Sequence, residues 1–105
     1  MKKYRVLLNG RNFILETGDD GPKKHGFFTT RWVKANDEVE AENSAVEMIR
    51  QCSKLRSAVL NEKDDPPRIF LEEIYIAGAF EYFRRKPGKG YVFYPEDESE
   101  ENGEA

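Results

Sequence analysis

The stretch "GFFTTRWVKANDEVEAENSAVEMIR", from Gly26 to Arg50, joins a strand pattern to a helix pattern and thereby decides the fold class. Residues 27–35 are rich in aromatic and β-branched side chains, which predicts a strand. From Asp37 onward apolar side chains recur at helical spacing, and Asp37 with Glu40 three residues later predicts an N-terminal capping box. The pattern therefore predicts a sheet covered by one main helix.

The predicted strand 27–35 carries apolar side chains on both of its sides. Strict alternation separates Phe28, Thr30, Trp32 and Lys34 from Phe27, Thr29, Arg31, Val33 and Ala35. We assign Phe28 and Trp32 to the helix-facing core. Arg31 is then expected on the outer face of the sheet, where a partner would bind.

The main helix is predicted to run from Asp37 to Leu55. Its apolar stripe consists of Ala41, Ala45, Met48, Ile49, Cys52, Leu55 and Val59. Cys52 lies near the middle of this stripe, so we expect a shielded, inert thiol whose pKa is raised by its apolar surroundings.

Turn signals divide the rest of the chain into short strands. Asn9-Gly10, between two apolar stretches, predicts a two-residue hairpin near the N-terminus. Residues 68–78 predict a fourth strand, with the adjacent Glu72 and Glu73 marking a bulge or an exposed edge. Residues 91–94 predict a final strand. The expected fold is α+β, an antiparallel sheet of about five strands with one main helix on one face, in the order β-β-β-α-β-β.

Composition predicts a single domain with an acidic tail. The chain has 105 residues and a net charge of −3, which suits one small globular domain. Acidic side chains crowd the segment after Pro95. We expect one domain over residues 1–95 and a solvated, disordered tail over residues 96–105.

Several features favour a cytoplasmic protein. The apolar runs are far shorter than the roughly 20 residues that a transmembrane helix needs, so no membrane contact is expected. The start "MKKYRVLLNG" does not resemble a signal peptide. A single cysteine allows no intramolecular disulfide, which is the usual state of cytosolic proteins.

The residue inventory argues against familiar catalytic and metal sites. His25 is the only histidine and lies in a glycine-rich loop, so no Cys-His pair and no His/Cys metal site is expected. The aspartate pairs at Asp19 and Asp64 lack the ligand spacing of a calcium loop. No glycine-rich phosphate loop or nucleophile elbow is present in the sequence. We therefore expect a non-enzymatic protein without metal or cofactor.

Two kinds of binding are consistent with the pattern. Residues 80–94 interleave aromatic side chains with cations, the residue types that stack on bases and neutralise phosphates. The candidate binding residues in this segment are Arg84, Arg85, Lys86, Lys89 and Tyr91. Apolar side chains such as Leu7 and Ile14, on the face away from the helix, favour a protein partner or a homodimer instead. Protein–protein contact through the outer sheet face, with Arg31 taking part, is the preferred hypothesis, and single-stranded nucleic-acid binding is the alternative.

The segments "KYRVLLNGRNFILE", "GFFTTRWVKA", "EAENSAVEMI", "DPPRIFLEEI" and "YVFYPED" resemble a group of small uncharacterised bacterial proteins over essentially the whole chain. The strands followed by the helix start "EVEAENSA" are also similar to the body of HicB-type antitoxins. The Pro-Gly-Cys segment and the DNA-binding helix-turn-helix of that family are absent from this sequence. The resemblance therefore implies a fold of strands and one helix, and antitoxin function is not carried over.

Overall fold

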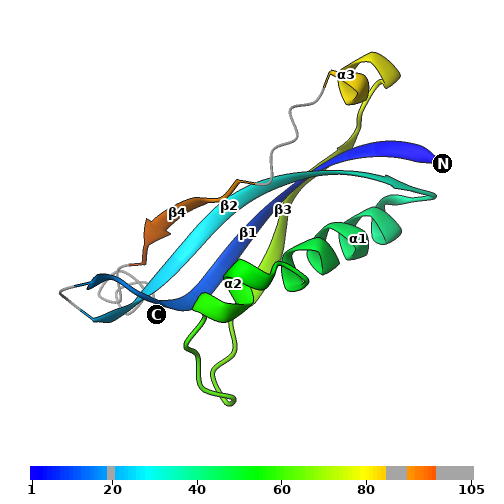
Figure 1. Ribbon diagram of the computed structural model, residues 1–105. Helices are drawn as coiled ribbons and strands as arrows, with labels where there is room; N and C mark the ends of the chain where they lie inside the picture. Colours follow the sequence, from blue (N-terminus) through cyan, green and yellow to red (C-terminus); the bar gives the residue numbers. More distant parts are fainter. Residues whose placement is uncertain (19–20, 85–89, 97–105) are drawn as a thin grey trace.

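The computed structural model describes residues 1–18, 21–84 and 90–96. Over these ranges the strands are β1 (Lys2–Glu16), β2 (Pro22–Ala35), β3 (Arg68–Ile76) and β4 (Val92–Pro95), and the helices are α1 (Glu38–Arg50), α2 (Ser53–Ala58) and α3 (Ala79–Phe83). The described strands form one antiparallel sheet in the order β3-β1-β2-β4, with α1 and α2 lying along one face (Figure 1). We call this the inner face and the opposite one the outer face. The predicted α+β class is confirmed.

The predicted order β-β-β-α-β-β and the fifth strand are wrong, because Asn9 and Gly10 lie inside β1 rather than in a turn. A two-residue type I′ hairpin needs positive φ at both positions. Among the described residues, positive φ occurs instead at Asn12, Gly18 and Gly21. The last two lie in the segment between β1 and β2. The observed order is β-β-α-α-β-α-β.

Gly10 and Gly26 are each needed because an aromatic ring lies across them. A methyl group on Gly10 would sit 2.3 Å from Cε2 of Phe27, which crosses β1 on the inner face. A methyl group on Gly26 would sit 2.3 Å from the ring of Tyr94. Both glycines are therefore strand positions that make room for a neighbouring strand's side chain.

The hydrophobic core lies between the inner face and the two longer helices. It consists of Tyr4, Val6, Leu8, Phe13, Phe27, Val33, Ala35, Ala41, Ala45, Ile49 and Leu55. Tyr4 pairs with Val33 and Val6 with Arg31, so Arg31 shares the inner face with the core residues. The assignment of Phe28 and Trp32 to the helix-facing core was wrong. Alternation along residues 27–35 predicts apolar side chains on both sides of the strand. Only the pairing of β2 with β1 decides which side faces the helices.

A β-bulge at residues 11–12 interrupts the pairing of β1 with β2. Asn12 has φ of 62°, a left-handed conformation that asparagine tolerates better than most residues. Glu96 accepts hydrogen bonds at Oε1 from Arg11 Nε and from the Asn12 backbone amide, both at 3.0 Å. The Glu96 side chain is only 3% exposed. The bulge is thus held by a residue from the far end of the described chain.

The loop after α2 forms hydrogen bonds to the backbone of β1 at and just after the same bulge. Asn61 Oδ1 accepts from the Ile14 amide at 2.9 Å, and its Nδ2 donates to the Asn12 carbonyl at 2.8 Å. The Leu60 amide also donates to the Ile14 carbonyl at 2.9 Å. These bonds continue the pairing of β1 beyond Arg11, the last residue of β1 that pairs with β3, at Arg68 where β3 begins.

The predicted helix Asp37–Leu55 is broken into α1 and α2 at Gln51 and Cys52. Cys52 has extended backbone angles and precedes α2 without a side-chain cap. The predicted start is confirmed, because Asp37 Oδ1 accepts from the Glu40 amide at 2.9 Å. Glu40 in turn accepts from the Asn36 amide, one residue before the position that a standard capping box uses.

Replacing Asp37 by alanine should lower the free energy of unfolding by about 1 kcal/mol, because the backbone amide of Glu40 loses the carboxylate oxygen that accepts its hydrogen bond. Urea denaturation measures this change. Asp37→Asn keeps a capping oxygen and should cost less than the alanine variant. An equal loss in both would mean that the charge, and not the cap, stabilises the helix.

The predicted strand at 68–78 is β3, and both expectations for its glutamates are met. The register of β3 against β1 shifts between Leu71 and Glu73, so Glu72 is the extra residue of a bulge. β3 is also an edge strand of the described sheet. Charged residues on a bulged edge disfavour pairing with foreign strands.

The acidic tail predicted for residues 96–105 lies outside the described residues from position 97 onward. Its first residue, Glu96, packs against the bulge and so belongs to the fold. The division into a domain and a tail stays a prediction.

Candidate binding surfaces

The outer face of the sheet exposes aromatic and aliphatic side chains. Phe70 is 46% exposed and Val92 is 69% exposed, and Phe28 and Tyr75 are exposed as well. The pairing of Asn9 with Phe28 and Phe70 places these two aromatic residues on the same side of the sheet. A shallow hollow beside Phe28 is lined by Leu7, Phe28, Thr29, Thr30, Gly90, Tyr91 and Val92. The predicted apolar character of the second face is therefore present.

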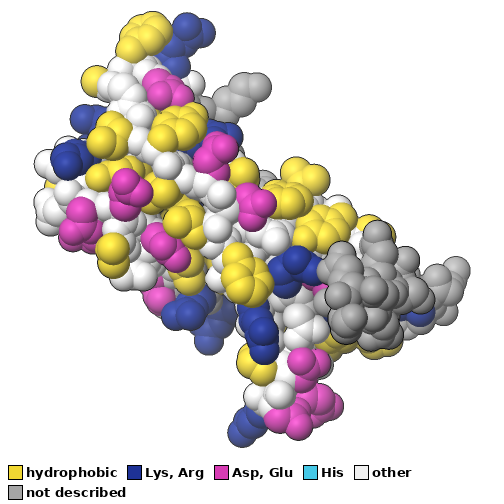
Figure 2. Space-filling view, turned by 180° about the vertical axis from the view of Figure 1, so that it is seen from behind, with side chains coloured by type: hydrophobic (Ala, Val, Ile, Leu, Met, Phe, Trp, Pro, Cys, Tyr) yellow, Lys and Arg dark blue, Asp and Glu magenta, His cyan; other side chains and the backbone are white. Residues whose placement is uncertain are grey.

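Charges of both signs occur among these apolar side chains. Arg5 forms an ion pair with Glu73 at 3.4 Å and lies over the Tyr75 ring at 5.5 Å. Figure 2, which views the molecule from the side opposite to Figure 1, shows hydrophobic side chains interspersed with acidic and basic ones. A surface of this composition is suited to contact with another mixed protein surface.

One end of the outer face is covered by α3. Tyr82 is buried there against Trp32, with ring centroids 6.2 Å apart in an edge-to-face arrangement. Lys34 Nζ lies 5.8 Å from the Tyr82 ring. Trp32 is therefore an intramolecular packing residue rather than an open binding residue.

Arg31 does not lie on the outer face, and this prediction was wrong. It is 5% exposed on the inner face, where it donates to Thr29 Oγ1 at 2.6 Å and to the Thr30 carbonyl at 3.0 Å. Its guanidinium lies 5.1 Å from the Tyr91 ring. Hydrogen bonds and a cation–π contact compensate for the burial of its charge.

The remaining predicted site residues are not brought together in the described structure. Arg84 is exposed next to α3 and stacks on Phe80 at 5.5 Å, whereas Tyr91 is half-buried on the inner face. Arg85, Lys86 and Lys89 lie outside the described residues. The exposed rings of Phe80 and Phe83 beside Arg84 are the described part of the predicted nucleic-acid segment.

Cys52 is half-buried beside Tyr91, and its chemistry differs from the expectation. The neighbouring Tyr91 hydroxyl and the backbone amides that follow Cys52 lower the pKa of the thiol, and the nearby Arg31 charge acts in the same direction. Burial raises the pKa of Tyr91 to about 12. Its hydroxyl has no well-formed hydrogen bond to a described residue. The prediction of a raised cysteine pKa was wrong, since polar neighbours outweigh desolvation at this site.

Alkylation of Cys52 should therefore report a pKa below that of a free thiol. Because only the thiolate reacts, the pH midpoint of iodoacetamide labelling in the folded protein should lie below that in denaturant. Tyr91→Phe removes the main cause and should move the midpoint upward. A midpoint unaffected by Tyr91→Phe would contradict the role of the hydroxyl.

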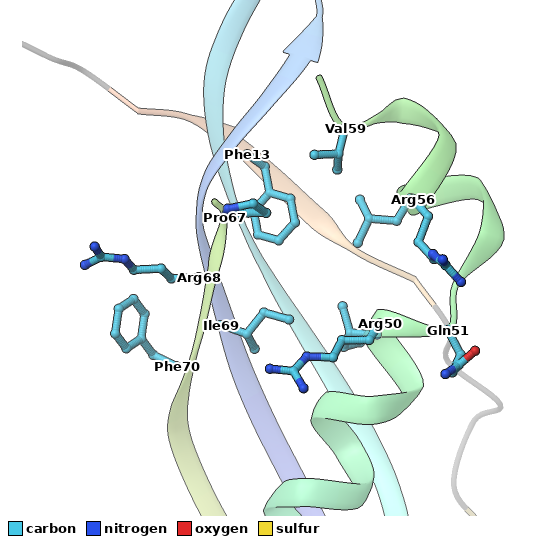
Figure 3. Close-up of a pocket in the computed structure, with 11 residues that line it drawn as sticks. Phe13, Arg50, Gln51, Arg56, Val59, Pro67, Arg68, Ile69 and Phe70 are labelled. Carbon is cyan, nitrogen blue, oxygen red and sulfur yellow. The ribbon is translucent and has the colours of Figure 1, made fainter. Parts of the chain in front are cut away.

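A groove opens where α1, α2 and the start of β3 meet, and we call it the arginine groove. It has a volume of about 850 Å³ and is lined by Phe13, Ile49, Arg50, Gln51, Leu55, Arg56, Val59, Pro67, Arg68, Ile69 and Phe70. Figure 3 shows Phe13, Val59 and Ile69 pointing into it, with Arg50 extending across from α1 toward β3. Arg56 and Arg68 lie at opposite sides of the groove (Figure 3).

Sequence reasoning missed the arginine groove because its walls come from three separate elements. Arg50 and Arg56 appear in the sequence as ordinary polar positions of a helix, and Arg68 follows a proline pair. Only the break at Cys52 turns α2 so that Arg50 and Arg56 lie beside one apolar floor, with Arg68 at its rim and directed away from it (Figure 3). No local pattern reports that arrangement.

Within the described ranges, no cluster of three or more His, Cys, Asp or Glu side chains is placed to hold a metal ion. None of the described helices is both long and apolar enough to cross a membrane. Comparison of the chain with protein families, with curated proteins and with solved structures found no match. The resemblance to small bacterial proteins and to HicB-type antitoxins therefore stays a prediction.

Proposed function

We propose that the chain is a non-enzymatic binding module that acts by protein–protein contact through the outer face of its sheet. The observation that carries this proposal is the exposed group Phe28, Phe70, Tyr75 and Val92. Helices α1 and α2 cover only the inner face, and α3 reaches only the end of the outer face, where the Tyr75 hydroxyl donates to Glu81 Oε2 at 3.3 Å. Phe28, Phe70 and Val92 have no described helix above them. Burying such apolar surface against a partner is favourable by about 25 cal/mol per Å².

The expected partner is a second copy of the chain. The outer face carries Arg5 and Glu73 within one apolar surface. A two-fold axis through such a surface can bring each charge of one copy near the opposite charge of the other. A cytoplasmic location, proposed from the single cysteine, would suit such a regulatory module.

Molar mass in solution tests this proposal. Light scattering at tens of micromolar should give the mass of a dimer, and Phe70→Glu should convert it to a monomer, because the substitution places like charges in the interface. Val39→Glu is the matched control, since Val39 is an exposed apolar residue on α1, 70% exposed against 46% for Phe70. A wild-type monomer, or a dimer unaffected by Phe70→Glu, would contradict self-association through this face.

Single-stranded nucleic-acid binding by residues 80–94 is the second candidate, supported by the exposed Phe80 and Phe83 beside Arg84. Such binding should weaken steeply as salt rises, whereas an apolar sheet interface should change little. Fluorescence anisotropy with a labelled oligonucleotide distinguishes the two. Retention of oligonucleotide binding in Arg84→Glu would remove this candidate.

A further inference from the structure

We propose that the arginine groove binds an anionic amphiphile, a small molecule with one carboxylate or phosphate head and an apolar chain. The apolar floor of the groove lies on the helix side of the sheet. The groove meets the outer face at its rim, where Arg68 and Phe70 point away from the floor (Figure 3). Its volume of about 850 Å³ falls within the usual range of small-molecule sites.

The floor of the groove supplies the apolar half of the site. Phe13, Ile49 and Leu55 belong to the hydrophobic core, and Val59 and Ile69 are half-buried against it. Figure 3 shows Val59, which directly follows α2, and Ile69 on β3 both pointing into the groove. An apolar chain placed between them would extend the core outward.

The arginines supply the charged half. Arg50, Arg56 and Arg68 contribute to the wall of the groove, and none of them forms an ion pair with a described residue, whereas Arg5 and Arg11 do. The Arg68 guanidinium points away from the groove (Figure 3), so Arg50 and Arg56 are the arginines offered to a ligand. Guanidinium groups pair with carboxylate and phosphate oxygens through two parallel hydrogen bonds. Arg50 is the expected principal contact because its side chain crosses the groove (Figure 3).

The same geometry disfavours other anions. A bare inorganic anion would leave the apolar floor unused. A nucleotide base needs an exposed ring for stacking. Phe13 in the floor is buried, and the exposed ring of Phe70 at the rim points away from the groove (Figure 3).

Calorimetric titration of the full chain with sodium decanoate, below its micelle concentration, tests the site. We expect saturable binding of one decanoate per chain. Arg50→Gln should weaken it about tenfold, the value of one charge-assisted hydrogen bond, and Arg56→Gln should weaken it less. Arg84→Gln, a change at an exposed arginine outside the groove, should leave the affinity unaltered.

Three further ligands identify the head and the chain. Decyl phosphate against decanoate shows which acid the arginines prefer, and tight binding of either supports the site. Equal affinity for decanol would overturn the role of the arginines, and equal affinity for inorganic phosphate would overturn that of the floor. Absence of saturable binding, or an unchanged affinity in a folded Arg50→Gln variant, would also refute the proposal.

Discussion

Replacing Phe27 by alanine is expected to lower the free energy of unfolding by about 3–5 kcal/mol. The Phe27 side chain is completely buried and lies 4.9 Å from the Phe13 ring, 5.0 Å from the Tyr91 ring and 5.6 Å from the Phe93 ring, measured between centroids. Alanine would remove the ring on which these three aromatic residues pack and leave a cavity over Gly10.

Urea denaturation followed by circular dichroism measures the Phe27 effect. Phe28→Ala is the matched control, because the neighbouring ring is partly exposed on the outer face and should contribute far less to stability. Phe27→Leu refills part of the cavity and should recover part of the loss. Equal destabilisation by the changes at positions 27 and 28 would contradict the assignment of faces.

Replacing Gly10 by alanine should destabilise the fold by about 1–3 kcal/mol, the usual cost of overpacking a core. The added methyl would lie 2.3 Å from the Phe27 ring and 2.8 Å from the Phe13 ring. Neither ring has space to move, because both belong to the buried core.

Gly26→Ala is the matched comparison for Gly10. The added methyl would also meet a ring at 2.3 Å, but the atoms in contact are the far end of the half-buried Tyr94 side chain. Moving that ring outward would break the hydrogen bond that Asn9 Nδ2 donates to its hydroxyl at 2.9 Å, but it would displace no fully buried ring, so the loss of stability should be smaller. Thermal unfolding of the two variants decides the comparison, and a larger loss for Gly26→Ala would show that the Tyr94 ring is the less movable one.

Local signals predicted the elements whose causes are local. The cap at Asp37, the start of the helix and the edge strand with its bulge at Glu72 all follow from neighbouring residues. The hairpin predicted from Asn9-Gly10 is wrong because a glycine is used equally well in a turn and at a strand position that an aromatic ring covers. That choice depends on Phe27, which is distant in sequence.

The site assignments failed for a related reason. The face occupied by Arg31 depends on the pairing of β2 with β1, and alternation within one strand cannot supply it. The arginine groove depends on the break at Cys52 and on where β3 begins. Both features are set by tertiary arrangement, so a single sequence read in local windows leaves them undetermined.

The bulge at residues 11–12 has a consequence for the cooperativity of unfolding. Glu96 from the end of the described chain and Asn61 from the loop after α2 both bond to the Asn12 backbone. Release of either segment would leave backbone groups of β1 without partners, which penalises any partly opened form. The edges of the sheet are thereby linked through its central strand, and the described part of the chain is expected to unfold in a single two-state transition.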